Sequence, residues 1–332
     1  MHMDGHPRRR ILFFLVPNFS MIAFAAAVEP LRLANRFLSR DAYDWRLVSE
    51  DGAPVAASNG ISINIDASLS DNKRIRCDPA GATLILVCAG LGVERYRNAD
   101  LFSWLRRMHG HGVAVGGLCT GAWVLAKAGL LENRCCAIHW ENLPGFTEQF
   151  PDTEAHSNLF ELHGNIYTCA GGTAALDMML HIICDDHGES IATKVCEQCL
   201  ADRVRDPRDH QRLPLRTRLG IHNAKLIDII ELMEANIAEP LSLAEISDLA
   251  GLSRRHIERL FRQHLGRSPA RYYLETRLEL ARHLLRQSDM HVVEVAMASG
   301  FVSASHFSKC YRGQFGASPQ TDRTATTSLV HA

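Results

Sequence analysis

Residues 243–269, LAEISDLAGLSRRHIERLFRQHLGRSP, decide the fold of the C-terminal part of this chain. The same pattern returns over residues 292–319 as VVEVAMASGFVSASHFSKCYRGQFGASP, with one residue inserted at its turn. In each copy an apolar-periodic segment ends at a glycine, a serine follows, and a second amphipathic segment closes at another glycine. Because glycine is favoured just after a helix and serine just before one, each copy predicts a helix-turn-helix unit.

The second helix of the first copy has an apolar face and a charged face. Ile257, Leu260 and Phe261 recur at helical spacing, which predicts that they are buried. The opposite face carries the residues that we expect to contact DNA: Arg254, Arg255, Glu258, Arg259 and Arg262. Arginine binds guanine through two hydrogen bonds or clamps a phosphate, which suits a helix lying in the major groove.

The second copy is less charged, which favours phosphate contacts over base contacts. Its expected DNA-contacting residues are Ser305, Ser308, Lys309 and Arg312. Residues 271–285 between the two copies predict a helix of about 22 Å, at about 1.5 Å per residue. A spacer of that length presents the two units to successive major grooves, about 34 Å apart.

The net charge of −1 conceals an uneven distribution of charge along the chain. Residues 221–250 hold one lysine against six acidic residues, whereas residues 251–323 hold twelve Lys or Arg against six acidic residues, a net charge of +6. A single basic helix is equally well explained as a solvated surface. Two copies with caps and glycines in register favour DNA binding, and the flanking acidic residues disfavour binding without sequence preference.

Residues 222–323 closely resemble the AraC/XylS DNA-binding domain. The similarity lies in Val295-Ala296, Gly300-Phe301, Ser305-His306-Phe307, Tyr311-Arg312, Phe315-Gly316 and Ser318-Pro319. The resemblance implies double-stranded promoter DNA as the partner, with base contacts from Arg255, Glu258, Arg259, Ser305, Ser308 and Lys309. The family usually follows Ser-Pro with a Tyr-Arg pair, whereas Asp322 precedes Arg323 here, which predicts a different docking of the terminal turn.

The first two hundred residues alternate short apolar runs with segments of helical periodicity. The predicted strands are 11–16, 83–88 and 113–115, and the predicted helices are 21–38, 94–109, 120–131 and 173–185. Apolar runs that end at Gly, Pro or Asn are typical of strands buried on both faces of a parallel sheet. The alternation predicts a doubly wound, mostly parallel α/β domain, with a small hairpin near Pro54 and Asn59-Gly60.

A cysteine stands at the corner between the strand 113–115 and the helix that follows it. Cys119, flanked by small residues, has the form of a nucleophile elbow, where helix-end N–H groups are expected to lower the pKa of the thiol. His139 and Asp177 complete a plausible Cys-His-acid set. This set defines the alternative hypothesis, a Cys-dependent amidase or deglycase with an attached DNA-binding domain.

This N-terminal region resembles the PfpI-type, class I glutamine-amidotransferase-like fold. Nearly the whole chain is similar to GlxA-type transcription regulators, and within them to regulators of carnitine and glycine-betaine catabolism. The matching stretches are Asn18-Phe19-Ser20-Met21, EPLRLAN at 29–35, Ser58-Asn59-Gly60 and His139-Trp140-Glu141-Asn142. The resemblance implies a ligand sensor without catalysis, and residues 17–22 carry no carboxylate where enzyme relatives place a Glu.

The implied effector is a small metabolite, such as a quaternary amine or an amino acid. A quaternary ammonium group is recognised by aromatic faces and a carboxylate. The expected ligand-binding residues lie in loops and at helix starts: Phe19, Glu29, Cys119, Trp123, His139, Trp140 and Gly172. We expect no functioning catalytic residue, and therefore a protein that is not an enzyme.

Length sets the expected domain organisation. The 332 residues predict a sensing domain at 9–200, a linker at 201–220, a DNA-binding domain at 221–323 and a disordered tail at 324–332. Three arginines at 8–10 before an apolar stretch imitate a secretory signal, but Pro17 interrupts that stretch. The chain contains no run of about 18 apolar residues, so we expect no membrane span.

Composition sets the expected compartment and partners. Ten cysteines scattered through a chain large enough to form its own core indicate free thiols in the cytoplasm. Cys196-x-x-Cys199 lacks a second pair of ligands, so we expect neither a metal nor a cofactor. The other expected partners are a second copy in a homodimer and RNA polymerase, and the expected direction of regulation is activation.

Overall fold

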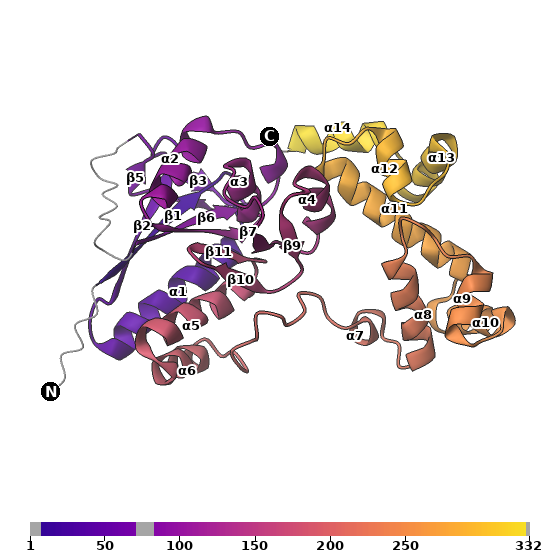
Figure 1. Cartoon of the computed structure of the whole chain (residues 1–332), viewed down its shortest axis with the longest axis horizontal. Helices are drawn as coiled ribbons and strands as arrows, with labels where there is room; N and C mark the ends of the chain where they lie inside the picture. Colours follow the sequence, from indigo (N-terminus) through magenta and orange to yellow (C-terminus); the bar gives the residue numbers. More distant parts are fainter. Residues whose placement is uncertain (1–7, 71–82, 330–332) are drawn as a thin grey trace. The chain divides into compact units, whose positions relative to one another are not determined.

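The computed structural model describes residues 8–70 and 83–329, and the chain divides into two compact units, Met1–Gln211 and Arg212–Ala332 (Figure 1). Each unit has its own hydrophobic core. Residues 330–332 of the expected tail lie outside the described residues.

The described part of the first unit is built around a seven-stranded sheet. Its strands, in spatial order, are β10 (Phe160–His163), β11 (Ile166–Cys169), β7 (Ala114–Cys119), β6 (Thr83–Ala89), β1 (Arg9–Leu15), β2 (Tyr43–Ser49) and β5 (Ala67–Ser68). All neighbouring pairs are parallel except β10 with β11. The predicted doubly wound, mostly parallel α/β fold is therefore confirmed. The winding reverses between β1 and β6, and such sheets bind ligands beyond the carboxyl ends of their strands.

Successive residues of β1 alternate between the two faces of the sheet. Ile11 and Phe13 join one apolar cluster, and Leu12 and Phe14 join another. The first cluster is covered by α1 (Met21–Leu38), α5 (Ala174–His187) and α6 (Glu189–Gln198), and the second by α2 (Ala99–Gly110) and α3 (Gly121–Lys127) (Figure 1). Because both faces are covered, the central strands β1 and β6 contain continuous apolar runs in the sequence.

Two predicted helices have different bounds in the structure. The helix expected from residue 94 begins five residues later, because the side chain of Asn98 accepts a hydrogen bond from the N–H of Leu101 at 2.8 Å and caps α2. A short 3-10 helix, Val93–Arg95, precedes it. The helix expected to reach residue 131 ends at Lys127, and Gly129 then turns the chain with a φ of +71°.

Smaller elements complete the first unit. The predicted hairpin is present as β3 (Val55–Ala56) paired with β4 (Ser62–Ile63). A second ribbon consists of β8 (Cys135–Ala137) paired with β9 (Glu154–His156). The strand β9 and the helix α4 (Leu143–Gln149) were not predicted.

Residues 199–214, between α6 and the next helix, are irregular, but Gln211 in this segment is hydrogen-bonded to the first unit. The side-chain amide of Gln211 donates hydrogen bonds to the carbonyl oxygens of Ile138 at 2.9 Å and Asn158 at 2.8 Å. Its side-chain oxygen accepts the N–H of Trp140 at 2.7 Å. Residues 201–211 of the expected linker therefore belong to the first unit. The rest of the expected linker contains a short helix, Leu215–Leu219, and Leu215 is buried in the core of the second unit. Turn residues without apolar periodicity predicted neither these contacts nor this helix.

The described part of the second unit consists of helices. These are α7 (Leu215–Leu219), α8 (Ala224–Ala235), α9 (Leu243–Ala250), α10 (Arg254–Leu265), α11 (Pro269–Gln287), α12 (Val292–Ala298), α13 (Ala304–Phe315) and α14 (Pro319–Leu329). α9 with α10 and α12 with α13 form the two predicted helix-turn-helix units. Ser253 caps α10 by accepting the N–H of His256 at 3.3 Å, and Ser303 caps α13 in the same way. The 19 residues of α11 span about 28 Å.

Asp322 fastens the terminal helix α14 to the rest of the second unit. Its carboxylate accepts hydrogen bonds from Arg282 at 3.0 Å, Arg286 at 2.7 Å and the hydroxyl of Tyr311 at 2.6 Å. Burial acts to raise the pKa of Asp322, but the hydrogen bonds and the two guanidinium charges outweigh it and lower the pKa. Asp322, which stands at the departure from the AraC pattern, therefore holds α14 against α11 and α13. Residues 324–329, expected as part of a disordered tail, are helical as the end of α14.

A helix that spans a bilayer needs about 20 mostly apolar residues, and none of the described helices has both this length and this composition.

Candidate DNA interface and effector site

The helix α10 presents the expected DNA-contacting residues on one exposed face. Ile257, Leu260 and Phe261 pack into the core of the second unit. The opposite face is exposed and carries Arg254, Arg255, Glu258, Arg259 and Arg262. Within residues 8–70 and 83–329, these five side chains form no hydrogen bond or ion pair, so their charges are free to act on a partner.

The arginines of the neighbouring helix α11 are used inside the protein. Arg277 donates a hydrogen bond to the carbonyl oxygen of Ser299 at 2.9 Å, and its guanidinium lies 4.2 Å from the centre of the Phe301 ring. Arg282 and Arg286 bind the carboxylate of Asp322. The charge of α11 is therefore partnered internally, whereas the charge of α10 faces solvent.

The helix α13 presents a smaller polar face. Phe307 and Tyr311 are buried in the core of the second helix-turn-helix. The expected contact residues Ser305, Lys309 and Arg312 are exposed, and Ser308 is half-buried. With only two cationic side chains among these four, the composition of this face fits phosphate contacts better than base readout.

The strand-to-helix corner expected after β7 is present at Cys119. This residue has a φ of +61°, a left-handed conformation that is uncommon outside glycine. Close packing surrounds the corner: a Cβ on Gly171 would lie 2.5 Å from the Cβ of Cys119, and one on Gly121 would lie 2.2 Å from the carbonyl oxygen of Val87. Glycine is therefore required at both positions to let the corner form.

The thiol of Cys119 is not activated by this corner. Burial raises its pKa to about 11, and hydrogen bonds with the N–H of Thr120 and the hydroxyl of Ser20 lower the pKa too little to compensate. The expectation of a lowered thiol pKa is therefore wrong. The free-energy cost of desolvating a thiolate at this site exceeds the stabilisation that the surrounding hydrogen-bond donors give it.

The described structure does not assemble Cys119, His139 and Asp177 into a hydrogen-bonded triad. The ring of His139 lies beside Trp140, with centroids 5.5 Å apart, and burial lowers its pKa. The side chain of Asp177 is 3% exposed, and its carboxylate accepts the N–H of Arg205 at 3.0 Å and two guanidinium nitrogens at 3.0 and 2.6 Å. The carboxylate of Asp177 is thus bound to Arg205 and does not orient His139 as the acid of a catalytic triad does.

At pH 8 we expect only about one Cys119 side chain in a thousand to be a thiolate, because the pKa of about 11 lies far above that pH. Alkylation by iodoacetamide, followed by peptide mass spectrometry, should therefore accelerate about tenfold per pH unit between pH 7 and 10. Amides, peptides and glyoxals should show no turnover that depends on Cys119. A labelling rate that levels off below pH 8, or turnover that Cys119→Ser abolishes, would restore the enzyme hypothesis.

A pocket of about 340 Å³ lies at the carboxyl ends of β1 and β2. Its lining is apolar around one aromatic ring and two carboxylates, and includes Leu15, Pro17, Pro54, Val55, Tyr96, Glu50 and Asp51. The described lining contains no lysine or arginine to offset these carboxylates. A pocket lined by one sign of charge raises the local concentration of the opposite sign, so this pocket favours a cation.

Tyr96 is fixed in the wall of this pocket by two neighbours. Its hydroxyl accepts a hydrogen bond from the side-chain amide of Asn98 at 3.2 Å, and its carbonyl oxygen accepts one from Nζ of Lys127 at 3.0 Å. Burial raises the pKa of Tyr96 to about 12, and the negative charge of Glu50 acts in the same direction. Glu50 and Tyr96 line the same pocket, so both can act on one guest.

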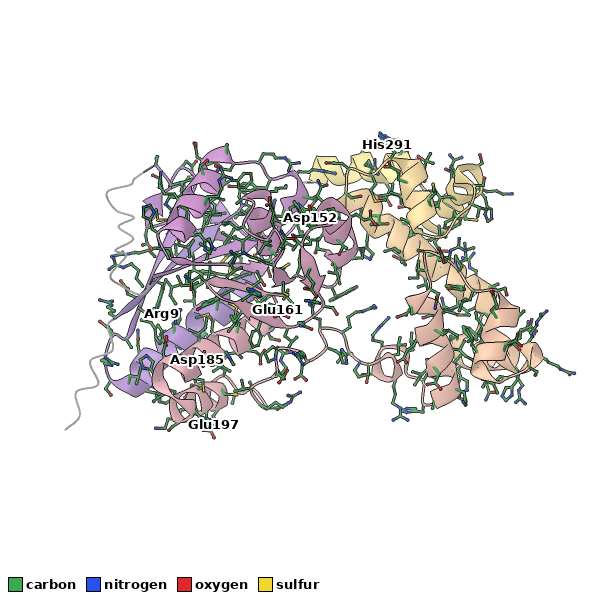
Figure 2. All side chains as sticks on the ribbon, in the orientation of Figure 1. Arg9, Asp152, Glu161, Asp185, Glu197 and His291 are labelled. Atoms are coloured by element: carbon green, nitrogen blue, oxygen red, sulfur yellow. The ribbon has the colours of Figure 1, made fainter. Side chains whose placement is uncertain are left out.

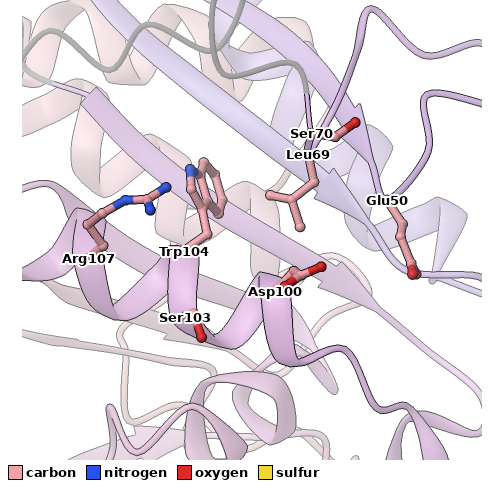
Figure 3. A pocket seen from close by; sticks show the side chains of 7 residues that line it. All are labelled: Glu50, Leu69, Ser70, Asp100, Ser103, Trp104 and Arg107. Carbon is pink, nitrogen blue, oxygen red and sulfur yellow. The ribbon is translucent and has the colours of Figure 1, made fainter.

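A second and more polar pocket, of about 260 Å³, is also lined by Glu50 (Figure 3). The helix α2 contributes Asp100, Trp104 and Arg107 to it. Because Arg107 lines this pocket together with Glu50 and Asp100, the pocket does not select a single sign of charge.

The α/β unit was then compared with known protein families. Residues 9–185, more than half of the chain, match the model of the DJ-1/PfpI family. The chain belongs to the DJ-1/PfpI family. Its residues 246–325 match the model of a helix-turn-helix domain, in agreement with the two units seen in the structure.

Similar proteins have the same combination of domains. This DJ-1/PfpI chain is 43% identical to the HTH-type transcriptional regulator GbdR of Pseudomonas aeruginosa, over 94% of this chain and 83% of the relative. It is 45% identical to CdhR of that organism (94% and 90% covered) and 37% identical to GlxA of Rhizobium meliloti (95% and 96% covered), both HTH-type transcriptional regulators. A solved AraC family transcriptional regulator from Pseudomonas putida is 30% identical, with a TM-score of 0.51, over 58% of this chain and 99% of that one. The predicted architecture is confirmed, and the protein is a DNA-binding transcription regulator.

The DJ-1/PfpI domain does not gather all the expected ligand-binding residues around one guest. Phe19 is fully buried in the cluster that α1 covers, and Trp123 is fully buried in the cluster on the opposite face of the sheet. Glu29 is 52% exposed and paired with Arg32 at 2.6 Å. The remaining expected residues follow the carboxyl ends of β7, β8 and β11: Cys119, His139, Trp140 and Gly172. Phe19 and Trp123 therefore do not face one guest, because core packing holds their rings on opposite faces of the sheet.

Sequence reasoning missed Glu50, Asp51 and Tyr96. The first two follow directly after β2, a strand whose sequence, YDWRLVS, mixes polar and apolar residues and was not predicted. Charged residues at the carboxyl end of a parallel strand are a usable signal once that strand is recognised. Tyr96 stands after a 3-10 turn that has no such signature.

Proposed function

We propose that this DJ-1/PfpI regulator binds double-stranded promoter DNA through α10 and α13, and that a small organic cation held by the α/β unit controls this binding. The observation that carries the DNA part is the set of exposed arginines on α10, which have no internal partner in the part of the chain that the structure describes. The arginines of the neighbouring helix α11 are partnered. Free guanidinium groups on a capped recognition helix match the donors needed at guanine edges and phosphates.

The effector part rests on the pocket at the ends of β1 and β2. Its volume of about 340 Å³ lies at the small end of the about 300–1,000 Å³ typical of ligand pockets. Glu50 and Asp51 attract a cation, the Tyr96 ring offers a cation–π contact of about 0.5–2 kcal/mol, and the apolar wall accepts alkyl groups. The ligand class is therefore an alkylated amine, within which quaternary amines fit best because the apolar wall offers their methyl groups contact.

Tetramethylammonium and choline should raise the melting temperature of the full-length protein, whereas tert-butanol, a neutral molecule of similar shape, should not. A ligand at 100 times its Kd adds about 2.7 kcal/mol to the free energy of unfolding. Glu50→Gln should remove the shift. Asp41→Asn removes another exposed carboxylate, just before the other end of β2, and should keep the shift. Equal stabilisation by the neutral and cationic probes would contradict the proposed ligand class without affecting the DNA assignment.

The proposal also covers how the regulator works. It acts in the cytoplasm as a homodimer, and ligand binding changes how many half-sites the dimer occupies together, which is a coupling free energy between two distinct sites. Activation through RNA polymerase is the proposed outcome. The raised pKa of Cys119 and the occupied carboxylate of Asp177 favour binding over Cys-dependent catalysis.

A further inference from the structure

The ribbon of β8 and β9 brings together three side chains that bind metals, away from the pocket at β1 and β2. The two strands are parallel, with Cys135 opposite Glu154 and Ala137 opposite His156. Residues two apart on a strand share a face, so Glu154 and His156 project from the same side of β9. Cys135 is the direct cross-strand partner of Glu154, which places its sulfur on that side as well.

The separations between these side chains suit a single small cation. The sulfur of Cys135 lies 3.1 Å from Oε2 of Glu154, and Nε2 of His156 lies 3.5 Å from Oε1 of Glu154. One ligand atom from each of the three residues lies within 4.8 Å of the others. Bonds of about 2.0–2.3 Å in tetrahedral geometry place zinc ligands about 3.3–3.8 Å apart, so small side-chain rotations close this set around an ion.

We propose that Cys135, Glu154 and His156 form a binding site for Zn²⁺, with water as the fourth ligand. A thiolate, an imidazole and a carboxylate are the three ligand types that zinc uses in proteins. A hard cation such as Mg²⁺ is disfavoured, because it requires oxygen ligands in octahedral geometry. The site departs from the expectation that this chain holds no metal, which rested on the missing second pair of ligands beside Cys196-x-x-Cys199.

A second carboxylate lies near the three proposed ligands. Glu161 lies on β10, a strand that packs against β8 (Figure 2). Its negative charge adds to that of Glu154 in attracting a cation. When the ion binds, the zinc–sulfur bond forms as the S–H bond of Cys135 breaks, and the proton leaves to solvent.

Binding at this site would join β8 to β9 through side chains in addition to their backbone pairing. Cys135 and His156 are half-buried and Glu154 is exposed, so the ion can enter from solvent and exchange. The strand β8 leads directly to His139 and Trp140, and the N–H of Trp140 is bound by Gln211. Zinc would thus rigidify the segment that leads from β8 to Trp140, to which Gln211 at the end of the first unit is hydrogen-bonded.

The test is titration of the metal-free full-length protein with Co²⁺, a spectroscopic probe for zinc sites. A near-ultraviolet thiolate-to-cobalt charge-transfer band should appear and should be abolished by added Zn²⁺. Cys135→Ser should remove the band. Glu154→Gln and His156→Ala should each weaken Zn²⁺ binding, measured against a chromophoric chelator, by more than about tenfold, since even outer-shell partners of zinc ligands contribute about 10–100-fold.

Cys199→Ser is the matched control, because Cys199 is another half-buried cysteine of the same unit and belongs to the Cys196-x-x-Cys199 pair. This variant should keep the band and the affinity. Absence of the band in the wild-type protein, or its persistence in Cys135→Ser, would overturn the proposal. We expect equal melting temperatures for the metal-free variants and the wild type, because the three ligands lie near the surface. Equal melting temperatures would exclude loss of folding as the cause of a lost band.

Discussion

Replacing Arg255 or Arg259 by alanine should lower the affinity for a cognate promoter by about 5–150-fold, equivalent to about 1–3 kcal/mol. Both side chains are exposed on α10, and within the described residues neither has an internal partner. Their loss should therefore be felt at the DNA rather than in the fold. The affinity is measured by fluorescence anisotropy, on a site selected from random DNA by the full-length protein.

Arg262→Ala is the matched control, since it removes the same kind of side chain from a later turn of the same exposed face. We expect it to weaken cognate and random DNA alike and to reduce the slope of log affinity against log salt by about 1, as loss of a phosphate contact does. If all three variants lose the same affinity on cognate and random DNA, α10 is not the helix that distinguishes bases.

Arg205→Ala should lower the free energy of unfolding of the first unit by about 2–4 kcal/mol. The side chain of Asp177 is 3% exposed and is left with a single main-chain donor when the guanidinium is removed. Breaking a buried ion pair costs about 3–5 kcal/mol, and the partial exposure of Arg205, 32%, reduces that cost. Urea unfolding followed by circular dichroism measures the change.

Arg203→Ala provides the comparison within the same segment. Arg203 is 61% exposed, and its ion pair with Asp209 lies at the surface, where such pairs contribute about 0–1 kcal/mol. Adding Asp177→Asn to Arg205→Ala should recover part of the loss, because it removes the uncompensated buried charge. Equal destabilisation by Arg203→Ala and Arg205→Ala would show that the buried carboxylate does not depend on Arg205.

The sequence by itself determined the two helix-turn-helix units. Ser253 and Gly251 act on backbone groups a few residues away, and the apolar stripe of α10 repeats every turn. Interactions of this range are visible in sequence because helix geometry fixes which residues meet. The apolar runs of β1 and β6 predicted the parallel sheet for the same reason, since strands covered on both faces must be apolar throughout.

Only the tertiary structure decided the chemistry of the first unit. The elbow at Cys119 was visible in sequence, but the pKa of its thiol depends on desolvation by segments that are distant in the chain. The sequence suggested that Asp177 orients a histidine, but in the structure its carboxylate binds Arg205. Glu50 and Tyr96 line one pocket because the end of β2 and the loop before α2 lie at the same edge of the sheet. Desolvation and charge pairing act through space, so they are set by which segments the fold brings together.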